Sequence, residues 1–353
     1  MIAYAAPSRV LRLAVALTIG TAWGSYAFTY LTRAQWQAGD FTQIWLAARA
    51  VLEGREAYAA VLEWERAGQY LNQLGLYYPL PAALLGLPFV GLRAEVAGAA
   101  FVAVTFALGA YVVTRERWIP LFAFVGPAAF HTARSAQLGG LLLAAMFLPR
   151  AWGWVTVLKP TVGLAAWLWR PSRTAAVLGA TVLAAGLLVD PAWPLRWLKT
   201  VHGSQYAIVP FAQAWFAPLL LLAALRWRTR GGRLLLAVSC VPHTMFWYDE
   251  MVLGAIPRTW REGLYPTIVA WAVYVAFRVT EHRAHPNVVY SWDGIPWSIA
   301  ALYIPALVLV LRHPNVGRIP APIERTFVRL SVPRWLVGQS AALDPTSAST
   351  RRA

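Results

Sequence analysis

Cysteine, lysine and acidic residues are scarce in this sequence, and each shortage limits what the chain can be. Cys240 is the only cysteine, which excludes an internal disulfide and a cysteine-based metal site. Lys159 and Lys199 are the only lysines among 31 basic residues, and the acids number 15. Glycine-rich phosphate loops, zinc-ligand spacings and nucleophile elbows are also missing. Any chemistry that the chain performs must therefore come from other side chains.

Hydrophobic residues, in contrast, make up 59% of the 353 positions, and apolar runs of about 20 residues recur along the whole length. The core of a soluble protein does not need so many long apolar runs. The formal net charge of +16 lies in short arginine clusters between these runs and in the C-terminal tail, which is typical of cytoplasmic loops. We therefore expect an all-α, polytopic protein of the cytoplasmic membrane, embedded in the bilayer and without a nucleic-acid partner.

The apolar runs predict about 12 spans, several of them shorter than the roughly 20 residues of an upright span. The first run lacks a convincing cleavage site and is expected to stay uncleaved. We expect a membrane domain over residues 1–311 and a basic, partly disordered cytoplasmic tail over residues 312–353. The predicted spans are 10–31, 78–92, 94–114, 118–131, 137–149, 151–169, 174–189, 209–225, 233–247, 250–257, 264–280 and 296–311.

The first connection between spans, residues 31–77, is the longest. Counting from a cytoplasmic N-terminus places it outside and the arginine-rich segment 226–233 inside. The connection is predicted to hold two amphipathic helices that lie in the membrane interface, over residues 41–53 and about 58–73. Asp40 precedes the first helix at the expected N-cap position. An acid is thus expected at the extracytoplasmic surface, with ordinary capping as the alternative to a chemical role.

Other polar side chains lie in or beside apolar runs, where a charge is costly unless it is paired or functional. Lys159 precedes a helix-breaking proline and could meet a phosphate; pairing with an acid such as Asp249 and snorkelling to the membrane surface are the alternatives. His243 lies near Asp249 and is a candidate ligand or orienter, although such a histidine is more often simply hydrogen-bonded. Arg134 and Gln137 form a polar group between two spans, or else an inside loop.

Five short motifs follow one another in order: GDF with LAARAVLEGREAY, then YYPLP, a Gln-Leu-Gly-Gly run, LKPTVGL, and a Pro-His and Tyr-Asp turn. This order resembles the polyprenol-phosphate-mannose-dependent mannosyltransferases of the GT-C class, glycosyltransferase family eighty-seven. The likeness covers about residues 10–260. The chain departs from the family pattern in having YPLP at 78–81 for YPPL and AQ at 136–137 for GQ. It also has a shortened segment between positions 137 and 159.

The resemblance implies a GT-C-like membrane glycosyltransferase. It would move a sugar from a polyprenyl-phosphate-sugar donor to a lipid, glycan or protein hydroxyl, with inversion, at the extracytoplasmic face. The sugar would be mannose, with arabinose and glucose as alternatives. Asp40 would be the catalytic base, without a cofactor or a metal. The residues expected to bind the donor phosphate or the substrate are Lys159, His243, Asp249, Gln137, Arg134 and Tyr78.

Two other classes compete with this prediction. A transporter or lipid flippase would explain the broken helices and the intramembrane Lys159. It also predicts an internal repeat, which the sequence does not contain, and it has no use for a long amphipathic first loop. A purely structural membrane protein would explain the apolar composition but would leave the Asp40 region without a role.

Overall fold

The computed structural model describes residues 8–69, 75–202, 208–244, 247–284 and 294–315, together with positions 326, 329 and 330. Over these ranges every regular element is a helix, and no strand forms apart from an isolated bridge between Ile208 and His243. The all-α prediction is confirmed. Most of the predicted tail, 312–353, lies outside the described part of the chain.

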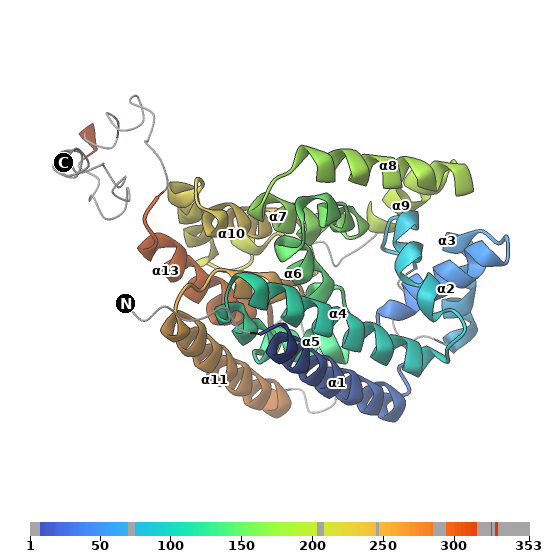
Figure 1. Ribbon diagram of the computed structural model, residues 1–353, viewed down its shortest axis with the longest axis horizontal. Coiled ribbons are helices and arrows are strands. Elements are labelled where there is room, and N and C mark those ends of the chain that lie inside the picture. The colour runs from blue at the N-terminus through green and yellow to red at the C-terminus, as the bar shows by residue number, and fades with distance from the viewer. Residues whose placement is uncertain are drawn as a thin grey trace.

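Within the described ranges, four helical segments are long and apolar enough to cross a membrane. They are α1 (Arg9–Ala34), α4 (Ala94–Glu116), α11 (Trp260–Ala284, apolar over Trp260–Glu281), and Gly294–Arg312, which joins α12 (Gly294–Ser298), the π-helical η9 (Ile299–Tyr303) and α13 (Ile304–Arg312). A fifth span results if α8 (Arg173–Val189) and α9 (Trp193–His202), bent by 105°, count as one. α1 and α11 run along one side of the molecule (Figure 1).

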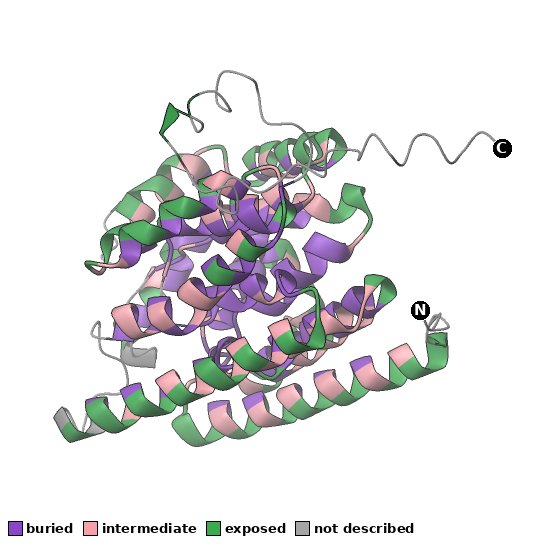
Figure 2. Cartoon of the chain, turned by 90° about the vertical axis from the view of Figure 1, so that its left-hand side faces the viewer, coloured by how far each residue is buried: buried purple, intermediate pink, exposed green. Residues whose placement is uncertain are grey.

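The outer surfaces of α1 and α11 are compatible with contact to lipid. Both helices are mainly exposed or half-buried, whereas the helices of the interior are largely buried (Figure 2). Their exposed side chains include Leu13, Leu17 and Phe28 on α1 and Ile268 and Val275 on α11. Apolar surface of this extent is unusual for a protein that is surrounded by water. A membrane protein is therefore supported at this coarse level.

The predicted count of about 12 spans is not confirmed, because many apolar runs form short helices in the interior. Their nine-residue member α6 is buried along its whole length and would extend only about 14 Å, roughly half of a bilayer core. Prolines at the first turns of α5, α7 and η7 explain several of the breaks. Every η element among the short helices is a 3-10 helix. The short helices are η2 (Leu80–Leu85), η3 (Leu87–Phe89), η4 (Ile119–Phe124), α5 (Pro127–Arg134), α6 (Gly139–Phe147), η5 (Arg150–Leu158), α7 (Pro160–Trp169), η6 (Pro210–Ala212), η7 (Ala217–Arg226), α10 (Arg230–Cys240) and η8 (Asp249–Ala255).

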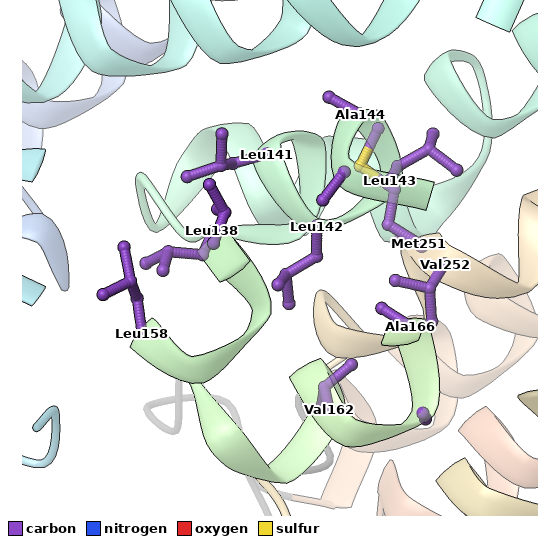
Figure 3. Packing of buried hydrophobic residues seen from close by; sticks show 14 of the residues in the cluster. Leu138, Leu141, Leu142, Leu143, Ala144, Leu158, Val162, Ala166, Met251 and Val252 are labelled. Atoms are coloured by element: carbon purple, nitrogen blue, oxygen red, sulfur yellow. The ribbon is translucent and has the colours of Figure 1, made fainter. Parts of the chain in front are cut away.

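The centre of the molecule is the packing of α6 against η5, α7 and η8. Leu138, Leu142, Leu158 and Val162 are each 0% exposed there, and Met251 of η8 approaches from the other side (Figure 3). In a bilayer, where lipid is as apolar as these side chains, close van der Waals packing holds such a core together. This core holds the starting ends of α6, α7 and η8 close together. It thereby brings together Gln137 and Lys159, which precede α6 and α7, and Asp249, the first residue of η8.

The first loop contains α2 (Phe41–Leu52), α3 (Ala57–Trp64) and a π-helical turn, η1 (Glu65–Gln69). The helix predicted over 41–53 is confirmed as α2, which is packed against the rest of the protein over most of its length, and its placement in the membrane interface stays a prediction. Phe41 stacks on Phe101 of α4 with ring centroids 4.1 Å apart. Gln43, expected on the polar face, is 4% exposed because its side-chain oxygen accepts a hydrogen bond from the backbone N–H of Tyr77. Residues 70–73 of the second predicted helix lie outside the described ranges.

Candidate functional site

Polar side chains from five separate segments meet in the interior of the molecule. Each segment contributes one residue, and each residue lies at the end of a helix or in a turn, where the backbone changes direction. A chain of hydrogen bonds and one ion pair links them. The five residues, in chain order, are Asp40, Tyr78, Gln137, Lys159 and Asp249.

Asp40 is positioned by its backbone as well as by its side chain. Its N–H donates to the carbonyl of Ser135 at 2.8 Å, and the preceding Gly39 has φ +63°, a conformation in which a side chain would be strained. Asp40 occupies the N-cap position of α2, as predicted, but its side chain does not cap the helix. Instead, Oδ2 accepts a hydrogen bond from Nε2 of Gln137 at 2.6 Å. Ordinary capping is therefore not what this half-buried carboxylate does.

Gln137 connects the acid to the rest of the group. While its Nε2 donates to Asp40, its Oε1 accepts hydrogen bonds from the Lys159 ammonium and from the Tyr78 hydroxyl, both at 3.1 Å. The orientation of the amide follows from these partners, because an ammonium can only donate and a carboxylate can only accept. Gln137 is 4% exposed. One buried amide thus couples the carboxylate of Asp40 to a positive charge.

Lys159 lies where η5 ends and α7 begins, so the predicted break before Pro160 is confirmed. Its ammonium forms an ion pair with Oδ1 of Asp249, which is fully buried, and lies 5.1 Å from the ring centroid of Tyr248. The lysine is 9% exposed, so snorkelling is wrong and pairing is what occurs. Oδ2 of Asp249 has no hydrogen-bond partner within the described part of the chain. Removing one member of such a pair typically costs about 3–5 kcal/mol.

Tyr78 lies in the turn before η2, outside the four long apolar segments. Burial, together with the nearby carboxylates of Asp40 and Asp249, raises the pKa of the Tyr78 hydroxyl well above its ordinary value. The hydroxyl therefore stays protonated and acts as a donor to Gln137. Its own carbonyl accepts a hydrogen bond from Tyr58 of α3 at 3.1 Å, which ties the first loop to the site.

His243 belongs to a second buried cluster, next to the first. Its Nδ1 lies 2.8 Å from the carbonyl of Val241, which can only accept, so Nδ1 carries a proton. Its Nε2 lies 2.9 Å from the hydroxyl of Tyr303, and that hydroxyl lies 3.4 Å from Oε1 of Glu250. Burial lowers the pKa of His243 and raises the pKa of Glu250 to about 8, so both are neutral at pH 7. His243 therefore reaches Glu250, rather than Asp249, through Tyr303.

Arg134 faces a different neighbour. At the last turn of α5, its guanidinium lies 4.7 Å from the ring centroid of Tyr30 on α1. The residue that follows it, Ser135, accepts the hydrogen bond from the Asp40 backbone. Arg134 thus lies next to the residue that holds the Asp40 backbone. A contact between Arg134 and a substrate stays a prediction.

One member of these clusters, Tyr303, was not expected from the sequence. Tyr248 and Glu250 flank Asp249 in the string WYDE, and the paired acids beside an apolar run are the signal that marks this turn. Tyr303 lies in a continuous apolar run, and its role follows only from the packing of η9 beside η8.

The fold and this site define a helical protein with several membrane-length apolar helices and a buried polar centre. No family model, curated protein or solved structure matches the chain. Among the described residues, His, Cys, Asp and Glu side chains do not gather in groups of three or more that could hold a metal ion. The chemistry of the site must therefore be argued from its own residues.

Proposed function

We propose that the chain is a membrane glycosyltransferase of the GT-C type, which transfers a sugar from a polyprenyl-phosphate-sugar to an acceptor hydroxyl with inversion. One observation carries the proposal: a half-buried carboxylate, Asp40, is not used as a helix cap and is linked through one amide to a buried ammonium. The motif order along the chain supports it. Mannose as the sugar, about 12 spans and an extracytoplasmic site in the cytoplasmic membrane belong to the same proposal.

The residues divide the reaction between them. Asp40 accepts the proton of the acceptor hydroxyl while the oxygen of that hydroxyl forms a bond to the anomeric carbon. On the opposite side, the bond from that carbon to the phosphate oxygen breaks, and the lipid phosphate leaves with the electron pair. Inversion follows because attack and departure occur on opposite faces of the sugar.

Lys159 is the proposed partner of the leaving phosphate. An ammonium has three N–H donors, and in Lys159 one is directed to Gln137 and another to Asp249. Within the described residues no hydrogen bond takes the third, and we assign it to a phosphate oxygen. Asp249 holds the lysine in place between turnovers, since an unpaired ammonium at this depth is costly. Gln137 then fixes the distance between the base and the cation.

A transporter or lipid flippase is the second candidate. The buried pair of Lys159 and Asp249, among apolar helices, is the observation that favours it, since such pairs often mark a substrate or proton pathway. A transporter would move a lipid or an ion without forming a covalent product.

The experiment that separates the two candidates uses purified protein in lipid nanodiscs. Radiolabelled polyprenyl-phosphate mannose, glucose and arabinose are each supplied with a membrane extract of acceptors, and the products are separated and identified. A labelled glycoside that forms only with active protein supports the transferase. Failure of every donor, combined with lipid flipping by the same protein in liposomes, would establish the transporter instead.

A further inference from the structure

A surface pocket of about 420 Å³ lies between α2, α3 and the turn that precedes α2. These helices lie at one end of the molecule, away from α10 and α13 (Figure 1). None of the residues assigned to the polar centre lines this pocket. Its main side chains are two tryptophans and four charged residues: Trp45, Trp64, Arg49, Glu53, Arg55 and Glu63.

The local sequence explains why the pocket forms. Trp45, Arg49 and Glu53 are spaced four residues apart and therefore share one face of α2. Gly54, with φ +68°, then reverses the chain. Glu56 caps α3 by accepting hydrogen bonds from two backbone N–H groups at 2.8 Å, which fixes the start of α3 beside α2.

The charged side chains of the pocket neutralise one another. Arg55 lies 3.4 Å from Glu53 and 3.0 Å from Glu63, while Arg49 lies 3.9 Å from Glu53. Two arginines and two glutamates leave no net charge to attract a phosphate or a carboxylate. All four remain 46–66% exposed and keep donors and acceptors directed to solvent. Planar guanidinium and carboxylate groups are well suited to bind the neighbouring hydroxyls of a sugar.

The two tryptophans provide the apolar part of the pocket. Trp45 is 6% exposed, is held by a hydrogen bond from its Nε1 to the carbonyl of Phe89, and has the Arg49 guanidinium 4.9 Å above its ring. Trp64 is half-buried at the end of α3. Trp45, covered by Arg49, therefore forms the base of the pocket, and the half-buried Trp64 supplies the aromatic surface beside the paired polar groups. Such a surface fits a ring that has one apolar face and a rim of hydroxyls.

The pocket also begins close to Asp40. Gln37, which lines it, lies three residues before Asp40, and Trp45 lies five residues after it. Five residues of helix extend about 7.5 Å, which is of the order of one or two sugar rings. A ligand that extends from the pocket along α2 by this length would bring its end to the level of Asp40 on the helix axis.

We propose that this pocket binds the neutral carbohydrate part of the acceptor, an oligosaccharide of about two or three units, the size that such a volume holds. The inference rests on the proposed transferase function and names its acceptor class. The rival role for Trp64 and the arginines is anchoring at the membrane surface, where such residues are common.

The test measures sugar binding without any donor. Full-length protein in nanodiscs is titrated by calorimetry with the trisaccharides of mannose, glucose and arabinose, and with an anionic glucuronate trisaccharide. We expect at least one neutral trisaccharide to bind, and the anionic one to bind more weakly. Trp64→Ala should weaken that binding about tenfold, the usual effect of losing one aromatic contact. Glu63→Gln, a change at a mostly exposed position, should weaken it less.

Two controls make the result decisive. Trp215→Ala removes an indole that is 92% exposed and lies outside the pocket, so it should bind the sugar as wild type does. Asp40→Asn should bind the sugar but fail to transfer. Absence of binding by every neutral sugar, or equal binding by wild type, Trp64→Ala and Glu63→Gln, would overturn the proposal and leave Trp64 as an anchor. If the wild type transfers sugar but binds no trisaccharide, only the proposed role of the pocket is rejected. If the wild type binds a trisaccharide but transfers no sugar, the proposed transferase function is rejected.

Discussion

The side-chain amide of Gln137 donates a hydrogen bond to the carboxylate of Asp40 at 2.6 Å, across 97 residues of sequence. This contact places the proposed base at a fixed position relative to α6 and to Lys159. A base that is held in place by an amide remains a proton acceptor while its orientation is restricted. The account of the site depends on this pairing.

Gln137→Ala should therefore reduce transfer by roughly 10- to 100-fold, the cost of a misplaced catalytic group, without unfolding the protein. The measurement is kcat with the identified donor and acceptor, together with thermal unfolding of the same sample. Gln213→Ala serves as a control, because Gln213 is exposed and bonds only a local carbonyl within the described structure. Unchanged turnover in Gln137→Ala would show that Asp40 does not need the amide.

Lys159→Met and Asp249→Leu should each destabilise the fold by about 3–5 kcal/mol, because each leaves a buried partner unpaired. The double variant Lys159→Met/Asp249→Leu should recover much of this loss in a double-mutant cycle. If Lys159 also binds the donor phosphate, the double variant should be stable but have a strongly raised donor KM. Lys199→Met, at the exposed second lysine, is the matched control. A stable double variant with an ordinary donor KM would remove the phosphate role.

Glu250 should make stability depend on pH. Its pKa is raised by burial to about 8, above the ordinary value of 4.5, so the folded state holds a proton that the unfolded state releases between these values. The contribution of Glu250 to the free energy of unfolding is therefore fully present below about pH 4.5, and it is lost as the pH rises to about 8. Glu250→Gln should flatten this part of the melting profile, while Glu95→Gln should not. Parallel profiles for wild type and Glu250→Gln would contradict the buried, protonated state.

How much of this could be predicted from the sequence differs between residues. The break at Lys159 followed from proline chemistry, which acts locally. The start of α2 after Asp40 was also predicted, although the side-chain cap on which that prediction rested does not form. The pairing of Lys159 with Asp249 was one of three alternatives, and only the packing of η5, α7 and η8 decides among them. The contact between Gln137 and Asp40 has no local signal at all.

The span count was less predictable for a different reason. Apolar periodicity shows that a run avoids water but not whether it meets lipid or protein. The run that became α6 is as apolar as a span, yet it is short and entirely buried. Gln43 shows that the pattern is equally ambiguous for a single polar residue. Although it lies beside an apolar stripe, its side chain accepts a hydrogen bond from a backbone N–H in the interior.

Sidedness is testable with single cysteines. After Cys240→Ser, a cysteine at Gln37 should react with an impermeant maleimide added to sealed cells, because the first loop is predicted to be extracytoplasmic. A cysteine at Ser347, which lies outside the described residues, should react only after the membrane is opened. Labelling of both positions from outside would reject the predicted topology.

The most direct measurement is sugar transfer by purified Asp40→Asn with the radiolabelled polyprenyl-phosphate sugar that the wild type uses. The substitution keeps the size of the side chain and its place beside Gln137 but removes the proton acceptor. We predict a loss of about 10²- to 10⁴-fold in kcat with an unchanged melting temperature and unchanged donor binding. Near-normal turnover by a folded Asp40→Asn protein would contradict the account, because Asp40 would then be only the residue that precedes α2.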